Sequence, residues 1–221
     1  MPTRRRPKKG YDFLEKQKYR QKIWNIFSQQ MTPESATIIM LPSKNGKEID
    51  IAIENGFKEE NIIAIDDDKA MLMWAPWRGK YPKIRIYADS ILRASKKLQK
   101  DKVIIHAINL DLCGNLSART FEQVSGFIKN ITVYNNPIIA ITMFKGREKH
   151  AVNCMAKIIV KKFKNDLKGI SKRLGVLLLI VKDKVPKISN ITQIAKGEYP
   201  NGVNTMDWGI FKLKMKLGEN E

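Results

Sequence analysis

Cysteines and long apolar runs are scarce in this 221-residue chain. The two cysteines, Cys113 and Cys154, are too few for a disulfide framework, so we expect an intracellular, cytoplasmic protein. No apolar run approaches the roughly 18–20 residues that span a bilayer, and the longest, Leu174–Val181, has the length of a strand. The basic N-terminus has no apolar segment behind it, which excludes a secretory signal. We therefore expect no membrane partner.

Acidic residues are few at the two ends of the chain. Residues 1–22 carry nine Lys or Arg against two acids, and residues 145–221 carry seventeen against seven. The middle, residues 23–144, is nearly neutral, with fifteen basic residues against thirteen acids. Because most of the formal charge of +19 lies in two separate flanks, we expect a polyanionic partner, and nucleic acid (RNA or DNA) fits best. A generic basic protein or a tail that binds a membrane surface are the alternatives.

The predicted organisation is a basic arm and helix at residues 1–31, followed by an α/β domain at residues 32–221. The arm is proline-bearing and polar, which predicts little structure of its own. A second cluster of lysines falls within a predicted helix at Lys149–Leu167. The candidate phosphate contacts in these two segments are Arg4, Arg5, Arg6, Lys8, Lys9, Lys161 and Lys162.

Apolar runs and helical periodicities alternate along the chain. Strands are expected at Thr37–Leu41, Asn61–Ile65, Lys83–Tyr87, Val103–Leu112, Pro137–Met143, Val176–Val181 and Asp207–Leu217. Helices are expected at Tyr11–Met31, Lys47–Asn55, Lys69–Trp74, Ile91–Leu98, Ser117–Ile128 and Lys149–Leu167, with a loop at Ala75–Pro82. This order predicts an α/β fold with a doubly wound, mostly parallel seven-stranded sheet. The two C-terminal strands are compatible with an antiparallel hairpin.

Glycine is also sparse in the turn after the first expected strand. That turn, Pro42–Gly46, contains one glycine, which makes it a poor phosphate cradle and counts against a dinucleotide ligand. Acids follow the next strands: Asp66 and Asp67 after the second, Asp89 after the third, and Asp111 at the end of the fourth. The carboxyl ends of parallel strands share one edge of the sheet, where such folds bind ligands. The sequence therefore predicts a ligand site there.

These strands and strand-end residues resemble the class I S-adenosylmethionine-dependent methyltransferase fold, especially its divergent forms in phages and other mobile elements. The resemblance covers about Thr37–Leu217, and a viral origin would place the protein in the host cytoplasm. It implies S-adenosyl-L-methionine as cofactor, with Asp66 and Asp67 at the ribose and Asp89 with Ser90 at the adenine. The cofactor-binding positions it implies are Leu41, Pro42, Ser43, Gly46, Asp66, Asp67, Asp89, Ser90 and Leu110.

The same resemblance places Asp111 near the methyl donor and the target atom. With Lys145, which follows the fifth strand, Asp111 is similar to half of the lysine–aspartate–lysine–glutamate set of RNA ribose methyltransferases. Asp111 and Lys145 are thus the candidate catalytic residues, with a capping acid and a phosphate contact as the simpler alternatives. No D/N-P-P-aromatic motif of amino-methylating enzymes occurs here. Cys113 lacks the preceding proline of cytosine C5 methyltransferases and is expected to be a small buried side chain.

The segment Trp74–Tyr81 combines aromatic and basic side chains. Trp77 and Arg78 are candidates for stacking on a base and contacting a phosphate, and packing of the aromatics onto the sheet edge is the alternative. His150 and Cys154 have metal-ligand spacing on one expected helix, but no further ligand lies nearby, so no metal is predicted. Two functions remain: a methyltransferase acting on nucleic acid, and a non-catalytic nucleic-acid-binding protein built on a degenerate methyltransferase fold.

Overall fold

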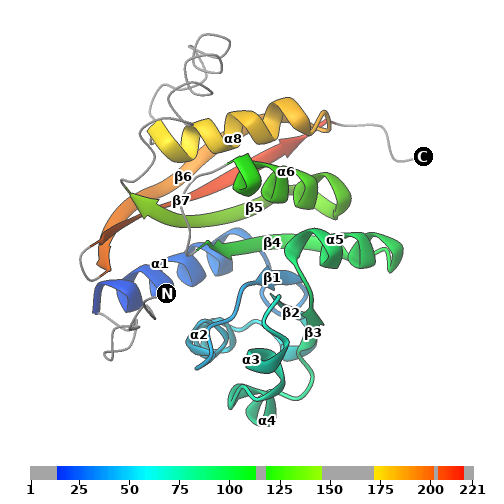
Figure 1. The fold of residues 1–221 in the computed structure, drawn as a ribbon, viewed down its shortest axis with the longest axis vertical. Coiled ribbons are helices and arrows are strands. Elements are labelled where there is room, and N and C mark those ends of the chain that lie inside the picture. The colour runs from blue at the N-terminus through cyan, green and yellow to red at the C-terminus, as the bar shows by residue number, and fades with distance from the viewer. Residues whose placement is uncertain (1–13, 113–117, 146–171, 202–203, 217–221) are drawn as a thin grey trace, which may run out of the picture.

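The computed structural model describes residues 14–112, 118–145, 172–201 and 204–216. Its strands are β1 (Ile38–Met40), β2 (Ile62–Asp66), β3 (Arg85–Ala88), β4 (Ile104–Asp111), β5 (Thr132–Lys145), β6 (Ile188–Asn201) and β7 (Asn204–Met215). Its helices are α1 (Leu14–Gln30), α2 (Lys47–Glu54), α3 (Lys69–Met73), α4 (Trp77–Lys80), α5 (Ile91–Lys100), α6 (Ala118–Asn130) and α8 (Lys172–Lys184), with a 3-10 turn, η1, at Glu59–Asn61 (Figure 1).

All seven strands form one sheet in the order β3-β2-β1-β4-β5-β7-β6. The strands β1 to β5 are parallel, β7 is antiparallel to both of its neighbours, and β6 forms an antiparallel hairpin with it. The predicted doubly wound, mostly parallel sheet is thus confirmed. The strand order reverses between β1 and β4, and the carboxyl ends of strands at such a point flank a crevice.

Apolar side chains cover both faces of the sheet, as parallel strands require. On one face, Ile39, Ile63 and Ile108 belong to a buried cluster with side chains of α5, α6 and α8. On the other face, Ile38 and Met40 belong to a cluster with side chains of α1, α2, α3 and α4. The α1 residues Ile23, Trp24 and Phe27 are buried in this second cluster, so α1 shares a core with the sheet.

Two expectations for the second half of the chain are wrong. Val176–Val181 lies in α8, not in a strand. The buried residues within and beside this segment follow helical spacing: Leu174, Leu177, Leu178, Val181 and Val185. The sixth strand is instead Ile188–Asn201, a more polar segment. Its register shifts between Ile188 and Asn190 and again between Gln193 and Ala195, and such bulges break the two-residue alternation that identifies a strand.

Smaller differences concern element ends. The expected loop at Ala75–Pro82 contains the short helix α4, and β5 begins five residues before the predicted Pro137, at Thr132. The predicted Lys149–Leu167 helix and the Ser117 helix cap lie outside the described residues. Within the described part of the chain, no helix has both the length and the apolarity to cross a membrane.

Candidate functional site

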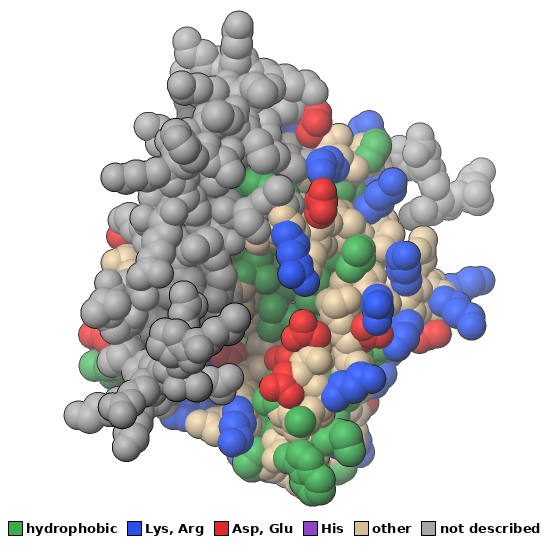
Figure 2. Space-filling model, viewed as in Figure 1, with side chains coloured by type: hydrophobic (Ala, Val, Ile, Leu, Met, Phe, Trp, Pro, Cys, Tyr) green, Lys and Arg blue, Asp and Glu red, His purple; other side chains and the backbone are tan. Residues whose placement is uncertain are grey.

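A cavity of about 420 Å³ opens at the carboxyl edge of the sheet, beside the reversal point between β1 and β4. Figure 2 shows a hollow on this side of the molecule, with acidic side chains gathered at its rim. The lining comes from the ends of four parallel strands and from α1, α2, α5 and α6: Lys16, Arg20, Leu41, Pro42, Ser43, Glu48, Ile65, Asp66, Asp67, Asp89, Ser90, Ile91, Asp111, Leu112 and Gln123. Eight of the predicted site residues are therefore together in one cavity.

The three aspartates after β2 have different surroundings. Asp66 is half-buried, and its Oδ1 accepts a 2.8 Å hydrogen bond from the Asp68 N–H. Burial raises the pKa of Asp66 above its ordinary value, and the charges of Asp67 and Asp68 raise it further. Asp68 caps α3 by accepting a 2.9 Å hydrogen bond from the Met71 N–H. Asp66 and Asp67 line the cavity, whereas Asp68 acts as the helix cap.

Asp89 and Ser90 lie at the end of β3 and the start of α5. The Asp89 Oδ1 accepts a 2.9 Å hydrogen bond from the Ser90 N–H, and its Oδ2 accepts one of 3.2 Å from Lys97 Nζ. Partial burial alone would raise the pKa of Asp89, but the Lys97 and Ser90 hydrogen bonds outweigh it and lower the pKa. Asp89 is therefore held ionised at the cavity rim, while Ser90 caps α5 through its hydroxyl.

The turn after β1 contributes Leu41, Pro42 and Ser43 to the cavity, but Gly46 does not line it. Gly46 adopts a left-handed backbone (φ +65) at the start of α2, and a Cβ there would lie 2.6 Å from the Trp77 ring. Gly46 thus has a packing role, and the expected approach of its backbone to a cofactor stays a prediction. The Trp77 indole occupies the space that a side chain at position 46 would need.

Trp77 is 3% exposed and belongs to the apolar cluster beneath α4. A buried ring has no face open to a nucleotide, so the expectation that Trp77 stacks on a base is wrong. The alternative raised by the sequence, aromatic packing onto the sheet, describes Trp77. Arg78 next to it is exposed, as a phosphate contact would need to be.

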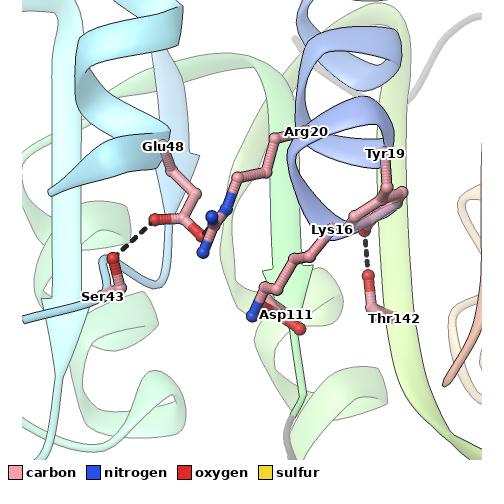
Figure 3. Close-up of polar contacts among 7 residues, drawn as sticks. All are labelled: Lys16, Tyr19, Arg20, Ser43, Glu48, Asp111 and Thr142. Carbon is pink, nitrogen blue, oxygen red and sulfur yellow. Dashed lines mark hydrogen bonds and ion pairs between the residues drawn. The ribbon is translucent and has the colours of Figure 1, made fainter. Parts of the chain in front are cut away.

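Asp111 lies at the tip of β4 and is held by α1 across the cavity. Its Oδ2 accepts a 2.8 Å hydrogen bond from Lys16 Nζ, and the two side chains are only 10% and 7% exposed (Figure 3). Its buried Oδ1 has no hydrogen-bond partner in the described part of the chain. A buried carboxylate oxygen without a partner is costly, and a bound ligand that donates a hydrogen bond would remove that cost.

Leu110, predicted to contact a cofactor, is fully buried in the cluster on the opposite face of the sheet. Side chains alternate between faces along a strand, so Leu110 points away from the side that Asn109 and Asp111 share. Its side chain does not line the cavity. The Asn109 side chain is buried, and its Oδ1 also lacks a partner among the described residues.

A second ion pair joins α1 to α2 beside the cavity. Arg20 Nε donates a 2.7 Å hydrogen bond to Glu48 Oε1, and Ser43 Oγ donates one of 2.8 Å to Glu48 Oε2 (Figure 3). Burial alone would raise the pKa of Glu48, but the Arg20 charge and the Ser43 hydrogen bond outweigh it and lower the pKa. Glu48 therefore stays ionised although it is almost fully buried.

Tyr19 completes the attachment of α1 by a hydrogen bond between its hydroxyl and Thr142 Oγ1 on β5. Burial and the nearby Asp111 charge raise the pKa of Tyr19 well above its ordinary value, so the phenol stays neutral. In Figure 1, α1 runs past the arrowhead of β4, and the Tyr19 and Lys16 side chains contact Thr142 of β5 and Asp111 of β4.

Lys16, Arg20, Glu48 and Gln123 are cavity residues that the sequence prediction missed. A signal was present for two of them, because Lys16 and Arg20 continue the helical spacing of the buried residues Ile23, Trp24 and Phe27. Charged residues in the apolar stripe of a helix need buried partners. Which partners they find depends on how α1 packs, and that is a tertiary property.

Several predicted residues have no described side chain. Lys145 ends β5, where it pairs with Thr205 of β7. Arg4, Arg5, Arg6, Lys8, Lys9, Lys161 and Lys162 lie outside the described residues, as do Cys113, His150 and Cys154. In the described ranges, no group of three or more His, Cys, Asp or Glu side chains is arranged to hold a metal ion.

Among known proteins, solved structures match this chain in fold. No protein-family model matches the chain, and no curated protein matches its sequence. A structure described as a methylase from Haemophilus influenzae matches with a TM-score of 0.54 and 11% identity, covering 89% of this chain and 97% of its own. The chain has the class I S-adenosylmethionine-dependent methyltransferase fold.

Two further structures with this fold differ in what they act on or bind. An O-methyltransferase from Bacillus cereus, in complex with SAH, matches with a TM-score of 0.55 and 9% identity, covering 93% of this chain and 84% of its own. An rRNA methylase from Streptococcus thermophilus matches with a TM-score of 0.51 and 11% identity, covering 88% and 95%. All three come from bacteria, and nothing in the comparison supports the phage or mobile-element origin that the sequence resemblance suggested.

Proposed function

We propose that the protein is an S-adenosylmethionine-dependent methyltransferase that acts on nucleic acid. The observation that carries the proposal is the single cavity that gathers the strand-end residues of β1, β2, β3 and β4. A volume of about 420 Å³ lies within the range of small-molecule sites. The methyltransferase fold and the SAH complex of the Bacillus cereus enzyme support this cofactor.

The charge of the cavity fits this cofactor. The lining carries five carboxylates, on Glu48, Asp66, Asp67, Asp89 and Asp111, against the two cations of Lys16 and Arg20. A surplus of carboxylates favours a ligand with a net positive charge, such as one that contains a sulfonium and an ammonium, and disfavours a polyanion. We therefore assign the cavity to the methyl donor and the reacting group of the acceptor, and we assign the phosphates of the nucleic acid to other surfaces.

Individual residues then have distinct roles. Asp66 would accept hydrogen bonds from ribose hydroxyls, and Asp89 with Ser90 would hold the adenine end. Lys16, Arg20 and Ser43 would form the end of the cavity that receives a carboxylate. The cofactor supplies an electrophilic methyl group, and the unpartnered Oδ1 of Asp111 would orient the acceptor or take up its hydrogen bond.

For the acceptor, we infer a ribose hydroxyl of RNA. Asp111 is paired with Lys16, and the sequence resemblance already joined Asp111 and Lys145 to a set that includes two lysines. A hydroxyl must lose its proton as the methyl group arrives, so a carboxylate and lysines near the acceptor suit O-methylation. The rRNA methylase with the same fold and the basic flanks support an RNA substrate.

One observation favours the non-catalytic alternative. The Lys16–Asp111 pair at 2.8 Å occupies one oxygen of the proposed catalytic carboxylate. A degenerate enzyme that keeps the fold only to bind nucleic acid would tolerate this pairing. Measurements of cofactor binding and of methyl transfer distinguish the methyltransferase from the non-catalytic nucleic-acid-binding protein.

The test is transfer of a tritiated methyl group from S-adenosylmethionine into pooled RNA and pooled DNA. We expect incorporation into RNA, and we expect Asp111→Asn to reduce it by about 100-fold or more because the substitution removes a charged group at the reacting atoms. Glu122→Gln, a charge-matched change on α6 outside the cavity lining, serves as the control and should retain full activity. Incorporation into neither pool would contradict the methyltransferase proposal and favour the non-catalytic alternative.

A further inference from the structure

An exposed tryptophan lies at the end of α3, apart from the cavity. The Trp74 side chain is 81% exposed and the adjacent Met73 is 60% exposed, whereas Trp24, Trp77 and Trp208 are all buried. Arg78 reaches back to this segment, with its Nη1 3.4 Å from the Met73 carbonyl oxygen. Two large apolar side chains next to each other in water are unfavourable unless they contact a partner.

A groove of about 490 Å³ opens next to these side chains, between α4 and the edge strand β3. Its lining combines apolar and polar surface and consists of Met73, Arg78, Gly79, Tyr81, Pro82, Ile84 and Ile86. At Gly79 an added Cβ would meet no atom within 4 Å, so this helix position faces open space. A larger side chain at position 79 would therefore extend into this space without a backbone clash.

The charge around the groove indicates the kind of partner. Residues 69–88 carry five Lys or Arg and no acid, and two acids from elsewhere in the chain contact this segment: Asp50 through Tyr81 and Glu59 through the Lys83 N–H. Lys80 pairs with Asp50 at 2.7 Å, but Lys69, Arg78 and Lys83 are exposed cations without such an ion pair in the described residues. An exposed aromatic ring combined with cations is the arrangement that binds single-stranded nucleic acid, through stacking and phosphate contacts.

The groove also lies within reach of a substrate at the cavity. The helix α3 begins at Lys69, directly after Asp66 and Asp67 of the cavity lining, and ends beside Trp74. Figure 2 shows apolar side chains gathered at the lower end of the molecule, over α3 and α4, with the acidic rim of the hollow above them. A strand of a few nucleotides could pass from one to the other.

We propose that Trp74 and this groove bind an unpaired base of single-stranded nucleic acid, with Arg78 and Lys69 contacting the adjoining phosphates. The kind of partner rests on the proposed function, but the site is separate from the methyl-donor cavity. A protein partner would also cover exposed apolar side chains. The surplus of exposed cations on residues 69–88 favours the polyanion.

The test is binding of a fluorescein-labelled single-stranded RNA of about 16 nucleotides, measured by anisotropy without cofactor. We expect Trp74→Ala to weaken binding about 10-fold and Gly79→Leu, which fills the groove, to weaken it similarly. Tyr134→Ala removes a 55% exposed aromatic on β5, which three strands separate from β3, and should leave affinity unchanged. Thermal unfolding of each variant verifies that it is folded.

Tryptophan fluorescence gives a second measurement on the same samples. Because the other three tryptophans are buried, unlabelled RNA should quench the Trp74 emission, and Trp74→Phe should lose that quenching while keeping most of the affinity. A duplex of the same sequence should bind more weakly, since its bases are already stacked.

The outcomes distinguish this inference from the proposed function. Wild-type affinity in both Trp74→Ala and Gly79→Leu, with RNA bound and methylated, would overturn the groove inference alone and leave a protein partner as its occupant. Failure of the wild type to bind any nucleic acid would contradict both. If the wild type transfers no methyl group but Trp74→Ala and Gly79→Leu bind RNA more weakly than it does, the groove inference is supported and the methyltransferase proposal is contradicted.

Discussion

At the scale of single residues, the site depends on carboxylates that are buried and paired. Arg20 and Glu48 form an ion pair whose side chains are 5% and 3% exposed. Removing one member of such a pair leaves an uncompensated charge away from water, which costs more than the loss of an exposed pair. The pair therefore fixes both the position of α1 and the shape of the cavity.

We expect Arg20→Gln to lower the free energy of unfolding by about 3 kcal/mol at neutral pH. Because the pKa of Glu48 in the folded protein lies below its ordinary value of 4.5, the stabilisation is present above that value and is lost as the pH falls below it. The difference between wild type and variant should therefore shrink in acid. Urea denaturation at neutral and at acidic pH measures the free energy of unfolding of wild type and variant. Lys18→Gln, at an exposed position, is the control and should change this free energy by no more than about 0.5 kcal/mol. A pH-independent difference would contradict this account.

At the scale of secondary-structure elements, the turn between β1 and α2 is defined by its packing against α4. Gly46 needs a left-handed backbone and a free space that the Trp77 ring borders. This interaction fixes the course of Pro42 and Ser43 along the cavity. The same glycine is therefore structural, although its place after the first strand is where the methyltransferase resemblance predicted a cofactor contact.

Gly46→Ala should lower the free energy of unfolding by about 2 kcal/mol, because the left-handed backbone is unfavourable for alanine and its Cβ would collide with Trp77. Gly79→Ala is the matched control: it lies in α4, meets no atom within 4 Å, and should be neutral or stabilising by up to about 1 kcal/mol. Chemical denaturation of the two variants measures the contrast. Equal stability of Gly46→Ala and the wild type would disprove the packing role.

The sequence predicted the elements whose signals are local and missed those that depend on packing. β1, β2, β3 and β4 are short apolar runs bounded by turns, and their ends brought Asp66, Asp89 and Asp111 to one edge as expected. The α8 helix was predicted as a strand because a short buried apolar run has no clear period. Lys16 and Arg20 could not be assigned to the cavity, since their partners lie 95 and 28 residues away along the chain.

At the scale of the whole molecule, the cavity and the two ends of the chain differ in the sign of their charge. The cavity has a surplus of carboxylates, while most of the formal charge of +19 lies in residues 1–22 and 145–221. Under the proposed function, the basic flanks attract the polyanion and the surplus of carboxylates in the cavity attracts the cationic methyl donor, while Lys16 and Arg20 of the first flank also line the cavity. We expect this distribution to let the proposed methyl donor and the proposed nucleic acid bind at the same time.

Deleting residues 1–10 should weaken RNA binding and reduce its dependence on salt, because five Lys or Arg are removed. Each lost phosphate contact lowers the slope of log affinity against log salt by about 0.7 for a single strand. Anisotropy titrations over a series of salt concentrations measure the slope. An unchanged slope would exclude the arm from the interface.

The central claim, that the cavity binds S-adenosylmethionine through the strand-end acids, is tested most directly by isothermal titration calorimetry of wild type, Asp66→Asn and Glu60→Gln. Glu60 is an exposed acid at the opposite end of β2 and matches the charge change. We predict that the wild type binds S-adenosylmethionine with micromolar affinity. Asp66→Asn should lower this affinity about 10-fold or more, and Glu60→Gln should leave it unchanged. Binding by the wild type should be lost as the pH falls through the raised pKa of Asp66. No heat of binding in the wild type, or equal affinity in Asp66→Asn, would contradict the account.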